Sequence, residues 1–64
     1  MKYPNVTVKL IGNDGNAFFI LGSVIRALRS ANVSEADISV YKKEAQSGDY
    51  DNLLQVTMKW VDVQ

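Results

Sequence analysis

Apolar and polar residues alternate near the start of the chain. Residues 6–10 read Val-Thr-Val-Lys-Leu, and this period of two is typical of a strand with one buried face. Pro4 stands just before the run, where its missing N–H costs little. The pattern predicts a strand over residues 5–11. Residues 12–15 read Gly-Asn-Asp-Gly, which tolerate positive φ and predict a tight turn after the strand.

The apolar spacing then becomes helical over residues 17–31. Asn16 can cap this helix through its side-chain oxygen. The predicted apolar stripe consists of Ala17, Leu21, Val24, Ile25 and Leu28. Phe18 and the two apolar residues after it make the first turn apolar almost all round, so we expect Phe18 at the centre of the core. Gly22 costs about 1 kcal/mol relative to Ala inside a helix, which suggests a close approach by a neighbouring backbone.

A second helix is predicted over residues 35–46. Asn32 is a good left-handed terminator for the preceding helix, and Ser34 and Asp37 occupy the two positions of a capping box. The side chains expected to face inward are Ile38, Tyr41 and Ala45, and those expected to face water are Lys42, Lys43 and Glu44. The buried stripe of this helix is therefore narrow.

A third helix is predicted over residues 50–59. Residues 47–49, Ser-Gly-Asp, can end one helix and cap the next. The apolar positions that continue at helical spacing are Leu53, Leu54, Met58 and Val61. Residues 60–63, Trp-Val-Asp-Val, suit a helix end or a short strand, and we favour a helix that becomes a strand near Trp60.

These elements together predict one small α+β domain over residues 1–64. Its order is β-α-α-α-β, with an N-terminal strand, three helices and a short C-terminal strand. An isolated two-stranded sheet is marginal, but helices that cover one face can stabilise it. We therefore expect the two ends of the chain to meet in a sheet.

Composition narrows the classes of function. The 64 residues leave room for one domain with a small core. They include no Cys and no His, so we expect no disulfide, metal site, cofactor or catalytic residue, and no enzyme. Seven basic and seven acidic side chains cancel, which disfavours nucleic acid as a partner. No apolar run reaches the ~18 residues of a membrane span and no signal peptide is evident, so a cytoplasmic protein without membrane contact is expected.

Two short patterns permit either a structural or a chemical role. Residues 12–16 join a strand to a helix N-terminus, as phosphate-binding loops do, but they include no Lys and contain Asp14. A plain turn is favoured there. Asp49 and Asp51 form a carboxylate pair, but their position at a helix start explains both through capping and the helix dipole.

The candidate interaction residues are Arg26, Arg29, Tyr41, Lys42, Lys43, Tyr50 and Trp60. Arg26 and Arg29 can form a small cationic face, although a solvated surface is the commoner role of such a pair. Tyr50 and Trp60 are candidate anchors because aromatic residues dominate interface hot spots, but core packing is the favoured role in so small a chain.

A helix-turn-helix is the alternative interpretation of residues 24–46. The residues that match its spacing are Leu28, Asn32, Val33, Ile38 and Tyr41. The start of the would-be recognition helix carries Glu35 and Asp37, where Arg, Lys, Asn or Gln are usually found. A structural pair of helices is therefore favoured over a DNA-binding or regulatory module.

Three stretches of the chain resemble a family of short bacterial and phage proteins without assigned function. They are residues 8–18, which contain Asp-Gly-Asn-Ala-Phe, residues 47–54, which contain Ser-Gly-Asp-Tyr-Asp, and Trp60-Val61. The resemblance implies a prokaryotic or phage setting and transfers no catalytic position. Together with the balanced charge and small core, it leads us to expect a non-catalytic interaction or accessory protein that binds an unidentified partner or itself.

Overall fold

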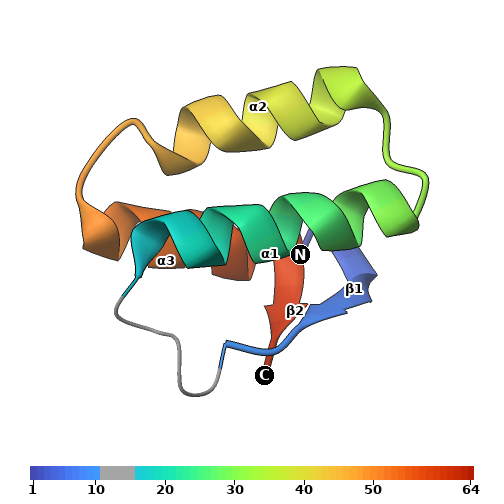
Figure 1. Ribbon diagram of the computed structural model, residues 1–64, viewed down its shortest axis with the longest axis horizontal. Helices are drawn as coiled ribbons and strands as arrows, with labels where there is room; N and C mark the ends of the chain where they lie inside the picture. Colours follow the sequence, from blue (N-terminus) through green and yellow to red (C-terminus); the bar gives the residue numbers. More distant parts are fainter. Residues whose placement is uncertain (11–15) are drawn as a thin grey trace.

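The computed structural model describes residues 1–10 and 16–64, and it confirms an α+β domain with the order β-α-α-α-β (Figure 1). Its elements are β1 (Tyr3–Val8), α1 (Ala17–Ser30), α2 (Glu35–Ala45), α3 (Tyr50–Trp60) and β2 (Val61–Val63). The turn predicted at residues 12–15, with the last residue of the predicted first strand, lies outside the described residues.

The two strands pair in parallel, so the segments near the two ends of the chain meet as expected. Thr7 pairs with Asp62, and the register is irregular between Tyr3 and Thr7. The pairing continues past the strand ends. The Gln64 N–H donates to the Val8 carbonyl at 2.9 Å, and the Leu10 N–H donates to the Gln64 carbonyl at 3.0 Å.

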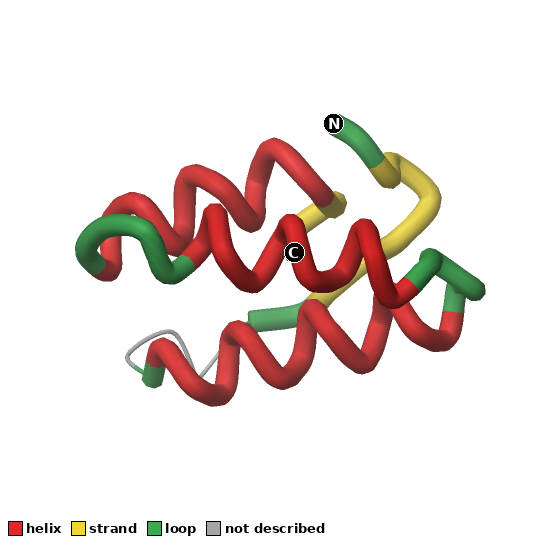
Figure 2. The backbone as a smooth tube through the Cα atoms, turned by 90° about the horizontal axis from the view of Figure 1, so that it is seen from above, coloured by secondary structure: helices red, strands yellow, loops and turns green. Residues whose placement is uncertain are grey.

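The helices lie on one side of this small sheet. In Figure 1, α1 and α2 run in opposite directions above the strands, and α3 lies behind α1. Figure 2 shows the same antiparallel course from above, so the direction of the chain reverses at each of the two helix connections. One face of the sheet is therefore covered by helices.

The helix boundaries follow from their caps. The side chains of Asn16, Ser34 and Asp49 accept hydrogen bonds from backbone N–H groups three residues further on, at 3.1, 3.2 and 2.9 Å. Asn32 has a φ of 64° and turns the chain after α1 in the left-handed conformation that its side chain tolerates. The Asp37 carboxylate accepts from the Tyr3 hydroxyl at 2.5 Å instead of closing a capping box. That bond ties α2 to β1.

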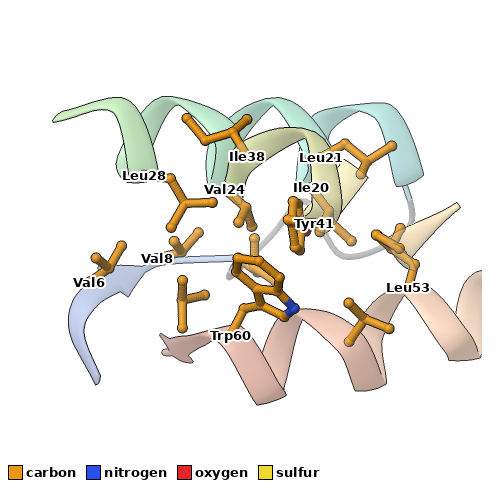
Figure 3. Close-up of a cluster of buried hydrophobic side chains, with 14 residues drawn as sticks. Val6, Val8, Ile20, Leu21, Val24, Leu28, Ile38, Tyr41, Leu53 and Trp60 are labelled. Atoms are coloured by element: carbon orange, nitrogen blue, oxygen red, sulfur yellow. The ribbon is translucent and has the colours of Figure 1, made fainter. Parts of the chain in front are cut away.

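The core lies between the helices and the sheet (Figure 3). Its fully buried side chains include Ile20, Val24, Leu28, Ile38, Tyr41 and Val61. The Tyr41 hydroxyl and the Thr57 hydroxyl share a hydrogen bond of 2.8 Å, so the one buried polar side chain among the described residues has a partner. Trp60 completes the core against the rings of Tyr3 and Tyr41, at 5.8 and 5.5 Å between centroids.

Phe18 is not in the core, so that prediction is wrong. Its exposed fraction is 86%, and that of Phe19 is 40%. Successive side chains turn by about 100° around a helix, so the face shared by Ile20, Val24 and Leu28 cannot also include Phe18. The run of apolar residues is wider than the face that α1 buries.

Two smaller expectations are also wrong. A Cβ atom built on Gly22 meets no heavy atom within 4 Å, so no backbone approaches this exposed glycine closely. Met58 is 51% exposed, because the buried face of α3 is formed by Leu53, Val56, Thr57 and Trp60. The narrow buried stripe predicted for α2 is confirmed.

Candidate functional site

An apolar hollow opens where the first turn of α1 meets the corner between α2 and α3. Its volume is about 280 Å³. Its lining includes Phe18 and Leu21 from α1, Ala45 at the end of α2, and Asp49, Tyr50 and Leu53 at the start of α3. We call this surface the Phe18 hollow.

The α2–α3 corner gives the hollow a defined wall. The Asn52 side-chain amide donates to the Glu44 carbonyl at 3.1 Å, and so binds the end of α2 to the start of α3. A Cβ atom at Gly48 would lie 2.9 Å from the Asn52 Cβ, which is closer than such atoms pack. The corner therefore needs glycine at this position to hold Asn52 in place.

Phe18 stands at the rim of this hollow with 86% of its surface exposed. A Phe side chain left in water forgoes about 1.5–3 kcal/mol relative to full burial. Tyr50, on the other side of the hollow, is 36% exposed. Two aromatic side chains at the rim of an apolar hollow are typical of the anchor residues and pockets found at protein interfaces.

Charge is sparse at this site. Asp49 is the one charged residue that lines the Phe18 hollow in the described part of the chain, and its carboxylate already accepts the Asn52 N–H at 2.9 Å. No cationic or nucleophilic cluster converges there among these residues. The arrangement is suited to taking up an apolar side chain.

Two of the candidate interaction residues lie inside the molecule, which agrees with the core positions favoured for them and corrects their inclusion among the interaction candidates. Tyr41 is fully buried, and its burial raises the pKa of its hydroxyl. Trp60 is 4% exposed, and its indole N–H donates to the Glu44 carboxylate at 3.2 Å. The Lys2 ammonium stands 4.5 Å from the Trp60 ring centroid. Tyr50 is the candidate that reaches the Phe18 hollow.

The four cationic candidates are exposed but do not gather at the Phe18 hollow. Arg29 forms a two-pronged ion pair with Glu35, with N–O distances of 3.0 and 3.1 Å. This hydrogen-bonded pair raises the pKa of Arg29 and lowers that of Glu35. Lys42 lines a separate polar hollow with these two residues. Arg26 and Lys43 point to water elsewhere.

The pair of helices proposed as a helix-turn-helix has a different geometry. The helices of that motif meet at about 90–120°, whereas α1 and α2 lie antiparallel in both Figure 1 and Figure 2. Glu35, at the start of α2, directs its carboxylate to Arg29.

Sequence reasoning missed the Phe18 hollow. The signal for it was the excess of apolar residues in the first turn of α1, which exceeds what one helix face can bury. That excess was interpreted as deeper burial.

Within residues 1–10 and 16–64, no helix is long and apolar enough to cross a membrane. These residues also contain no group of acidic side chains arranged to hold a metal ion.

The fold and the hollow together define a small α+β domain with an exposed aromatic surface. Comparison with protein-family models, with curated proteins and with solved structures gives no match. The resemblance to short bacterial and phage proteins therefore stays a prediction.

Proposed function

We propose that this protein is a small, non-catalytic interaction or accessory protein of bacterial or phage origin, and that it binds a partner protein through the Phe18 hollow. The observation that carries the proposal is the 86% exposure of Phe18 beside a hollow of about 280 Å³. A partner side chain that enters the hollow would bury Phe18 and Tyr50 together. Buried aromatic anchors are the residues that contribute most to protein interfaces.

The size of the hollow supports this proposal. A cavity of about 150 Å³ suffices for a benzene molecule, so the hollow can receive one large apolar side chain. The helices that line it pack on a common core, so the surface is already formed before binding. A pre-formed site loses less conformational entropy on binding than a mobile one.

Site-specific photocrosslinking tests the proposal. A benzoylphenylalanine residue is placed at position 18 in cells of the native host, with the same probe at Val40 as control. Val40 is also an exposed apolar residue, at 48%, but it does not line the hollow. We expect a discrete adduct from position 18 only, and its loss when Leu53, which lines the hollow, is replaced by Ala in a chain that still melts cooperatively. Equal labelling from both positions would contradict the proposal.

No observation favours the DNA-binding alternative as a second proposal. The antiparallel course of α1 and α2 and the pairing of Arg29 with Glu35 give it no support. A low-salt mobility-shift assay on random DNA tests it, because even sequence-specific readers retain salt-dependent affinity for any DNA.

A further inference from the structure

The outer edge of β1 offers backbone groups that β2 does not use. The Val8 carbonyl and the Leu10 N–H bond to Gln64. Successive residues of a strand direct their N–H and C=O groups to opposite edges. The N–H and C=O groups of Thr7 and Lys9 therefore point away from β2. Within the described residues, neither residue has a backbone bond on that side.

A third hollow lies directly beside this edge. It has a volume of about 290 Å³ and is lined by Asn5, Val6 and Thr7 of β1, by Ala27 and Ser30 of α1, and by Ala31 directly after that helix. No residue of β2 contributes to it. The end of α1 thus stands over the space that a further strand would occupy. Its small side chains leave room for the inward-facing residues of that strand.

The charged side chains near this edge favour an acidic binding partner. The edge carries the exposed Lys9, and the exposed Arg26 precedes Ser30 by one turn of α1. None of the six residues that line the hollow is acidic. Asp62 belongs to β2, which pairs with the opposite edge of β1. Its carboxylate accepts a hydrogen bond from the Gln64 side chain. An added segment with carboxylates on its solvent face complements these two exposed cations.

A second copy of this chain fits this edge poorly. Pairing two copies through the same edge would bring both α1 helices to one face of the joined sheet, around a two-fold axis. The hollow shows that one α1 already extends over that region. An extended segment without a helix has no such conflict.

We propose that β1 takes up an extended acidic segment of another protein as a third strand, next to Thr7 and Lys9. Main-chain hydrogen bonds between β1 and the segment supply affinity. The hollow beside Thr7 accommodates every second side chain of the segment and favours those of modest size. This edge is separate from the Phe18 hollow and the inference does not depend on the function proposed there.

Amide NMR spectra of the full chain test the inference with two synthetic probes. One is acetyl-Val-Glu-Val-Glu-Val-Glu-amide, and the other has Lys in place of each Glu. We expect the acidic peptide to shift the amide signals of Thr7 and Lys9 and to slow their hydrogen exchange. The basic peptide should bind about tenfold more weakly. Phe18→Ser should leave both results unchanged, which separates this test from that of the Phe18 hollow.

Two substitutions provide matched controls. Thr7→Pro removes the outward N–H and should abolish binding, whereas Thr7→Val keeps it and should bind as the natural chain does. Arg26→Glu should lower the preference for the acidic peptide even if Thr7→Pro fails to fold. No perturbation at millimolar peptide would overturn the inference. So would perturbation centred on the Phe18 hollow, or concentration-dependent dimerisation that protects the same two amides.

Discussion

The ring of Phe18 is exposed to solvent, although completely buried side chains lie within one turn of it along α1. We expect Phe18→Ala to change the free energy of unfolding by less than about 0.5 kcal/mol, because an exposed side chain loses few contacts. Leu28→Ala, on the buried face of the same helix, should cost about 2–5 kcal/mol. Urea unfolding followed by circular dichroism compares the two. A loss of several kcal/mol from Phe18→Ala would place its ring inside the core.

The hydroxyl pair of Tyr41 and Thr57 is the second prediction at this scale. Tyr41→Phe leaves the buried Thr57 hydroxyl without its 2.8 Å partner, which should cost about 1–3 kcal/mol. The double variant with Thr57→Val replaces both polar groups by apolar ones and should recover part of that loss. Urea unfolding of the single and double variants measures the recovery. If the double variant is simply the sum of its parts, the two hydroxyls are not energetically coupled.

At the level of elements, the short strand β2 contributes more to the stability of the fold than its length suggests. Removing residues 61–64 deletes the partner of β1, the fully buried Val61 and the two backbone bonds that join Gln64 to Val8 and Leu10. We expect loss of cooperative thermal unfolding, or aggregation through the exposed strand edge. Asp62→Ala is the control, since it leaves the backbone pairing intact. An unchanged melting midpoint for the shortened chain would mean that the sheet is dispensable.

The elements themselves could largely be predicted from the sequence. Asn16, Ser34 and Asp49 are local capping signals, and local hydrogen bonds suffice to place a helix start. The parallel direction of the strands could not be predicted, because alternation of apolar residues does not encode strand direction. The exposure of Phe18 and Met58 depends on which face the neighbouring elements cover, and that is a property of packing. The Phe18 hollow is formed by three helices, so its local signal in the sequence was limited to the excess of apolar residues in the first turn of α1.

For the whole molecule, two tyrosines predict a loss of stability in alkali. The carboxylate of Asp37 raises the pKa of Tyr3, mainly through their hydrogen bond, and burial raises the pKa of Tyr41. In the unfolded chain both phenols ionise near their ordinary pKa of about 10. The contribution of these two raised pKa values to the free energy of unfolding is therefore complete below that pH. It is lost as the pH rises through the higher pKa values of the folded state.

Urea midpoints measured at neutral pH and above pH 10 check this expectation. The variant that combines Tyr3→Phe and Tyr41→Phe should show a smaller alkaline loss than the natural chain, although it starts from a lower stability. An equal loss in both proteins would assign the alkaline effect to other groups.

The parallel pairing of β1 with β2 also governs the order in which the molecule can assemble. The contacts within each helix are local and form quickly, whereas joining the strands requires closure of the segment that holds all three helices. On the ribosome, β1 is synthesised first and has no strand partner until β2 has emerged. We therefore expect the helices to form before the sheet, with pairing of the two strands as a late step in folding.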